Sequence, residues 1–170
     1  KTYKFLSSPS QTQDEFGVSI VRNLDNVGGL YHATSLGQSY LIAGKNLVSN
    51  AKKITDLTNA LTIDGMAWTP DGFSASELQG KVSIVINPNN ALQADVYVKE
   101  SDGFTKYEFT RSDVDTPWST TGSKEVLSAE EIAAVEKSTK RDLNYDGFFG
   151  ARITELKNAP GGLYSVTYGD

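Results

Sequence analysis

The chain contains no cysteine and a single histidine among its 170 residues. Without cysteine it cannot form disulfide bonds, thiolate nucleophiles, zinc ribbons or iron–sulfur clusters of its own. With only His32, histidine-rich metal centres are excluded, and any Ser/His/Asp triad would depend on that one residue. We therefore expect a protein that is not an enzyme.

Long apolar runs are also missing, since no stretch approaches the ~18 residues of a membrane-spanning helix. The 21 acidic residues outnumber the 16 basic ones, and a net charge of -5 is the wrong sign for neutralising phosphates. We expect no membrane span and no nucleic-acid partner. No signal-type apolar segment follows Lys1, which predicts a mature or excised fragment.

An internal repeat is present near the two ends of the chain. Residues 16–34 and 149–167 match at 8 of 19 positions, with an offset of 133 from Gly17 to Gly150. This favours one repeat unit (16–150), preceded by the end of a unit or a linker (1–15) and followed by the opening of the next (151–170). Two similar strand–turn elements inside one closed domain are the alternative.

Short strand-like runs separated by Gly, Asn, Asp and Pro fill most of the interval. The expected strands cover residues 30–35, 39–43, 82–86, 94–99 and 104–110, and turn residues at 36–38 and 101–103 predict that the first two and the last two form hairpins. A helix is predicted from Ser128, with Glu131 completing a capping box, and residues 113–122 are predicted to form a loop. The predicted fold class is α+β, a β-dominated antiparallel sheet with one clear helix near the C-terminal side.

A cation-binding pattern follows the predicted helix. Asp142, Asn144 and Asp146 place oxygen-bearing side chains at alternate positions, and Gly147 permits a sharp turn. The main-chain carbonyl of Phe148 falls at the seventh position, where such loops offer a backbone ligand to Ca²⁺. We expect a calcium site made of these groups.

The match to an EF-hand loop is partial, because its twelfth position is Ile153 instead of a glutamate. Glu136, Glu155 or water would have to supply the missing ligand. With two charged ligands, the affinity is expected near 10⁻⁴ to 10⁻³ M, as in extracellular modules. The alternative is an Asx-rich turn that holds no ion.

Glu130, Glu131 and Glu136, followed by DLNYDGFFG at residues 142–150, resemble the "E…DLNGDGxxG" ending of repeats in very large secreted proteins of cyanobacteria and proteobacteria. The tryptophan-rich Synechocystis-type C-terminal domain belongs to this group. Tyr145 stands where the usual residue is glycine. The resemblance implies a calcium-stabilised module of an adhesin-like surface protein, located outside the cell or on its surface. Its implied partners are neighbouring repeat units and a cell-surface glycan or protein.

A carbohydrate-binding module is the alternative function. Trp68 and Trp118, with Tyr97 and Tyr107 on predicted strands, could stack against sugar rings if they were exposed in a groove. Two tryptophans in a chain of this size are more often core residues. The exposure of Trp68 and Trp118 therefore discriminates between the two functions.

Overall fold

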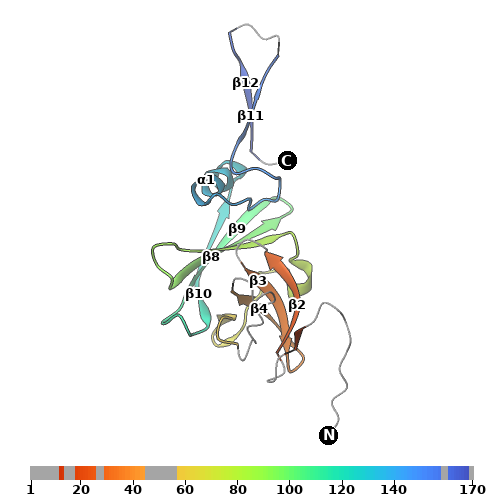
Figure 1. Cartoon of the computed structure of the whole chain (residues 1–170), viewed down its shortest axis with the longest axis vertical. Helices are drawn as coiled ribbons and strands as arrows, with labels where there is room; N and C mark the ends of the chain where they lie inside the picture. The colour runs from red at the N-terminus through yellow and green to blue at the C-terminus, as the bar shows by residue number, and fades with distance from the viewer. Residues whose placement is uncertain (1–11, 14–17, 26–28, 45–56, 158–160, 169–170) are drawn as a thin grey trace.

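The computed structural model describes residues 12–13, 18–25, 29–44, 57–157 and 161–168. Its fold is α+β and β-dominated, with one α-helix near the C-terminal side, as the sequence predicts. The strands form a four-stranded sheet, a six-stranded sheet and a separate two-stranded hairpin (Figure 1). Residues 1–15 were predicted to be the end of a preceding unit or a linker, and residues 1–11 and 14–15 of this segment lie outside the described residues.

The four-stranded sheet has the order β1-β2-β3-β4, with every pair antiparallel. Its strands are β1 (Thr12–Gln13), β2 (Val18–Asp25), β3 (Leu30–Ser35) and β4 (Gln38–Ala43). The predicted hairpin of β3 and β4 is confirmed. Its two turn residues, Leu36 and Gly37, have φ values of 50° and 80°, the left-handed geometry that suits the twist of a tight hairpin.

The six-stranded sheet has the order β6-β5-β10-β9-β8-β7. Its strands are β5 (Leu61–Ile63), β6 (Met66–Ala67), β7 (Val82–Ile86), β8 (Gln93–Glu100), β9 (Gly103–Thr110) and β10 (Trp118–Leu127). The predicted strands at β7, β8 and β9 are confirmed, and a 3-10 helix, η1 (Ala75–Glu77), precedes β7. Among the strands of the described residues, β5 and β10 form the one parallel pair.

The predicted loop over residues 113–122 is wrong in its second half, because β10 begins at Trp118. The Trp118 N–H donates to the Ala60 carbonyl at 2.9 Å. The first residue of β10 therefore pairs with a segment that is distant in the sequence. Gly122, with φ of 80°, lies within a register shift between Thr120 and Lys124. This irregularity disrupts the alternating pattern on which strand prediction depends.

The main core lies between the four-stranded and six-stranded sheets. Leu24, Leu30 and Leu41 of the first sheet belong to one buried cluster with residues of the second, including Val96 and Phe109. The opposite face of the six-stranded sheet carries a smaller cluster with Tyr97, Phe104, Leu127, Ile132 and Leu143. The sheet is therefore covered on both faces near its β8–β9 end.

Helix α1 (Ala129–Thr139) provides part of that second cover. Its predicted capping box is present, since the Ser128 hydroxyl accepts from the Glu131 N–H and the Glu131 carboxylate accepts from the Ser128 N–H. The helix ends at Thr139 and is capped by Lys140, whose φ of 54° is left-handed. No helix in the described part of the chain is long and apolar enough to cross a membrane.

The chain then forms an irregular loop over residues 141–150, named here the junction loop, and enters the hairpin of β11 (Arg152–Glu155) and β12 (Tyr164–Thr167). The hairpin extends away from the two larger sheets, beyond α1 (Figure 1). The junction loop therefore lies where the main body and the hairpin meet.

Candidate functional site

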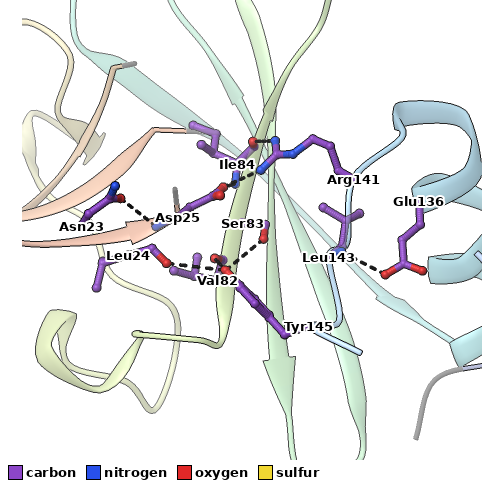
Figure 2. A network of polar contacts seen from close by, with 10 residues as sticks. All are labelled: Asn23, Leu24, Asp25, Val82, Ser83, Ile84, Glu136, Arg141, Leu143 and Tyr145. Carbon is purple, nitrogen blue, oxygen red and sulfur yellow. Dashed lines mark hydrogen bonds and ion pairs between the residues drawn. The ribbon is translucent and has the colours of Figure 1, made fainter. Parts of the chain in front are cut away.

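The junction loop packs against α1, the end of β2 and the start of β7 (Figure 2). Leu143 is buried in the cluster under α1, and Asn144 is buried beside it. The loop thus connects elements that are far apart in the sequence, and the predicted calcium ligands lie on it.

Glu136, on the last turns of α1, holds the loop from the helix side. Its side chain is fully buried, and its Oε1 accepts from the N–H groups of Leu143 and Asn144 at 2.9 and 3.0 Å. Its Oε2 accepts from the Gly150 N–H at 3.1 Å. Burial raises the pKa of the Glu136 carboxyl, although these N–H groups favour its charged form.

Gly150 closes the loop against the helix. A Cβ at this position would lie 3.0 Å from the Ala133 carbonyl oxygen, and φ is 103°. Only glycine combines this close approach with this backbone conformation. The glycine of the repeated Phe-Gly pair therefore has a packing reason in its second copy.

The predicted ligands Asp142, Asn144 and Asp146 point into a single turn of the loop. Asp142 Oδ1 and Asn144 Oδ1 both accept from the Asp146 N–H, at 3.0 and 2.9 Å. Because they share one donor, these two oxygens lie side by side. Asp142 Oδ2 accepts from the Gly147 N–H at 2.8 Å, and Asp146 Oδ1 accepts from the Phe148 N–H at 2.8 Å.

These groups are hard oxygen donors, the type that Ca²⁺ prefers. One contact would have to change on ion binding, since Asn144 Nδ2 donates to Asp146 Oδ2 at 3.1 Å. In the described part of the chain, no three or more His, Cys, Asp or Glu side chains gather in a metal-binding group, so Glu136 is not brought together with Asp142 and Asp146. The Glu136 carboxylate instead anchors the loop by accepting from main-chain N–H groups of the loop. The Phe148 carbonyl or water would have to complete the coordination of an ion.

Tyr145, which stands where the motif it resembles has glycine, adopts the left-handed conformation with φ of 63°. That conformation costs a non-glycine residue roughly 1–2 kcal/mol. The side chain offsets this cost by reaching β7, where its hydroxyl donates to the Val82 carbonyl at 2.5 Å and accepts from Ser83 Oγ at 3.3 Å (Figure 2). Its ring is partly exposed.

Arg141 and Asp25 complete the contact with β7. Arg141 Nη2 lies 2.6 Å from Asp25 Oδ2, and Arg141 Nη1 donates to the Ile84 carbonyl. Asp25 Oδ2 also accepts from the Ile84 N–H at 2.8 Å. Since β7 is the last strand of its sheet, Arg141, Asp25 and Tyr145 cover the outer-edge groups of Val82 and Ile84.

The sequence did not predict this edge cover. Arg141 directly precedes the ligand pattern, and Tyr145 lies within it. The presence of tyrosine where the resembled motif has glycine was the only local indication of a role for either residue. Asp25 has no local feature that identifies it. Its role depends on strands that come together only in the folded chain.

The two tryptophans are not exposed, which corrects the expectation of an aromatic platform. Trp68 is 6% exposed and Trp118 is 1% exposed, and both belong to the core between the sheets. Trp68 packs edge-on against Tyr107 and Phe109, with centroid distances of 5.0 and 4.7 Å. Tyr97 and Tyr107 are also buried. None of these rings is available to stack on a sugar.

A pocket of about 240 Å³ lies on the six-stranded sheet, with Asp95 and Glu108 in its lining. These residues are directly opposite each other on β8 and β9. Burial raises the pKa of Asp95, while the charge of Lys106 opposes this. Lys106 lies 3.5 Å from Glu108 and 2.7 Å from Glu125, so the carboxylates belong to a cluster of ion pairs on the strands.

His32 is buried on β3, where its Nε2 lies 3.1 Å from Ser39 Oγ. Burial, and then the charge of Arg22, lower the pKa of its imidazole. Its other ring nitrogen has no partner in the described residues. His32 is therefore a neutral residue of the sheet.

No protein-family model matches the chain, and no curated protein or solved structure does so either.

Proposed function

We propose that the chain is a non-enzymatic repeat module of a large exported, adhesin-like surface protein, stabilised by calcium at the junction loop. The ligands would be the side chains of Asp142, Asn144 and Asp146 and the main-chain carbonyl of Phe148. The partners would be neighbouring repeat units of the same chain, with a cell-surface glycan or protein as the adhesive target.

One observation carries the calcium proposal: the oxygens of Asp142 and Asn144 share a donor in a loop held between α1, β2 and β7. An ion at this loop would draw Asp142, Asn144 and Asp146 together at the base of the β11–β12 hairpin. Ion binding would thereby restrict the movement of the hairpin relative to the main body.

The expected affinity suits an extracellular or cell-surface location. A site with two carboxylates and few other ligands is expected to bind calcium at about 10⁻⁴ to 10⁻³ M. Because the ligands converge only in the folded chain, calcium would stabilise the native state by mass action. The module would then be less stable where calcium is scarce and become rigid after export.

The test is thermal unfolding in excess chelator and in calcium, comparing the wild type with Asp142→Ala/Asp146→Ala. At ten times the dissociation constant, calcium should stabilise the wild type by about 1.4 kcal/mol and raise its midpoint by roughly 3–6 °C. The double variant should show no rise.

Asp113→Ala/Asp115→Ala is the matched control, because it removes the same charge from another exposed loop. That loop contains a similar turn, in which the Asp115 N–H donates to Asp113 Oδ1. This control should respond to calcium as the wild type does. The calcium proposal fails if the wild type does not respond, or if Asp142→Ala/Asp146→Ala keeps the response.

A further inference from the structure

The two copies of the sequence repeat form hairpins that share their pairing register at the first two pairs, before a register shift in the first copy between Ile20 and Arg22. In the first copy Ser19 pairs with Thr34 and Ile20 with Ala33. In the second copy Arg152 pairs with Thr167 and Ile153 with Val166, which are the same positions shifted by 133. The β11–β12 hairpin therefore repeats the start of the β2–β3 hairpin in both sequence and strand pairing.

The two hairpins differ in burial. Ile20, Tyr31 and Ala33 are 3%, 4% and 0% exposed and belong to one buried cluster. Their counterparts Ile153, Tyr164 and Val166 are 67%, 59% and 50% exposed. These three side chains lie on one face of the hairpin, since Ile153 is opposite Val166 and Tyr164 is two residues away.

Strand β4 is a major part of what covers the first copy. It pairs with β3 along its whole length, and Ile42 of β4 lies in the same cluster as Ile20, Tyr31 and Ala33. In the described part of the chain, β12 pairs with β11 alone, so its second edge has no strand partner there. An apolar face beside an unpaired edge is a template for strand addition.

We propose that β12 receives an antiparallel strand with the sequence pattern of β4, supplied by a following copy of this repeat. The register of β3 and β4 predicts that Tyr164 would lie opposite the counterpart of Ile42, and Val166 opposite the counterpart of Tyr40. The inference rests on the repeat-module part of the proposed function and is independent of the calcium part.

The shared register favours this occupant over an unrelated protein. Leu163 and Tyr164 keep the identities of Leu30 and Tyr31, the two β3 residues that pair with Ala43 and Ile42. Gly169 and Asp170 align with Leu36 and Gly37, the positions that form the turn into β4. A second copy of residues 38–157 placed directly after Asp170 would therefore enter the sheet in the register of β4.

The experiment extends the full chain by residues 38–157 after Asp170 and measures hydrogen exchange of the β12 amides that do not bond β11. These amides should exchange at least about 100-fold more slowly than in the unextended chain. A second extension, with residues 38–44 alone, supplies the strand without requiring a whole unit to fold. It should slow exchange about tenfold. Unchanged exchange of β12 in both chains would overturn the proposal.

Val166→Asp and Thr167→Asp test the apolar face with the same charge on adjacent residues. Both side chains are exposed in the unextended chain, where each substitution should shift the midpoint by less than about 2 °C. In the extended chain Val166→Asp should abolish the protection of β12, because the counterpart Ala33 is fully buried. Thr167→Asp should retain it, since the counterpart Thr34 is only half-buried.

All exchange measurements are made both in chelator and in calcium. Protection of β12 in both conditions supports the inference even if the junction loop binds no ion, so the two proposals fail separately. The mass of the unextended chain, measured by sedimentation, tests whether hairpins of two molecules pair with each other. A dimer that Val166→Asp dissociates would show that a second molecule occupies β12, and it would overturn the assignment to a following unit.

Discussion

Arg141 and Asp25 lie 116 positions apart in the chain and form an ion pair with 2.6 Å between Nη2 and Oδ2. The side chains are 12% and 4% exposed, and both also bond the main chain of Ile84. This contact joins the junction loop, the four-stranded sheet and the edge of the six-stranded sheet. Its removal should therefore affect the whole body.

Arg141→Met should lower the free energy of unfolding by about 3–5 kcal/mol, because it removes the cation that lies 2.6 Å from the buried Asp25 carboxylate. Urea denaturation at neutral pH measures the change. Lys106→Met is the control: it breaks ion pairs whose acidic partners are about half exposed, and it should cost no more than about 1 kcal/mol. Equal losses for the two variants would contradict a special role for Arg141.

Tyr145→Phe should lower the free energy of unfolding by about 1 kcal/mol, since it removes the hydroxyl that donates to the Val82 carbonyl. The left-handed backbone strain remains in the variant, but the bond that offsets it is lost. Chemical denaturation gives the difference. Tyr40→Phe removes a hydroxyl that bonds exposed Gln38 and should be nearly neutral. A loss at Tyr40 as large as that at Tyr145 would refute this account.

Glu136→Gln should cost about 1–3 kcal/mol, although the two side chains have nearly the same shape. Both carboxylate oxygens accept hydrogen bonds from main-chain N–H groups, one from Leu143 and Asn144 and the other from Gly150. In glutamine one of these oxygens becomes an NH₂ group, which cannot accept and therefore leaves its N–H partners without an acceptor. Glu130→Gln, at an exposed position of the same helix, should change little. Equilibrium unfolding of both variants provides the test, and a neutral Glu136→Gln would exclude the anchoring role.

His32 should make stability depend on pH below 6.5. Burial lowers the pKa of its imidazole in the folded chain from the ordinary value of 6.5, so the unfolded chain binds the proton more readily. Stability is therefore lost as the pH falls from 6.5 through the lowered pKa, and it is regained as the pH rises.

Proton NMR of the single imidazole gives the pKa directly, and thermal midpoints across this pH range give the stability. His32→Gln should remove the part of the pH dependence that lies just below 6.5. A native pKa at or above 6.5 would show that the buried ring accepts its charge without penalty.

Features decided within a few residues could be predicted from the sequence. The capping box of Ser128 and Glu131 spans one helical turn, and the β3–β4 and β8–β9 hairpins join strands that are neighbours in the chain. The oxygen pattern of Asp142, Asn144 and Asp146 likewise folds within its own loop. In these cases the interacting groups are held together by chain connectivity, so a local pattern contains the information.

Tertiary structure decided the features that join distant segments. The start of β10 depends on Ala60, and the cover of the β7 edge depends on Asp25, Arg141 and Tyr145. Local pattern left the exposure of Trp68 and Trp118 open, and packing between two sheets buried both. Burial and edge pairing are properties of surfaces built from many segments, and no single stretch of sequence carries them. Local sequence is therefore sufficient to specify the turns, the helix start and the repeat, whereas the packing of the sheets sets which copy of that repeat is covered.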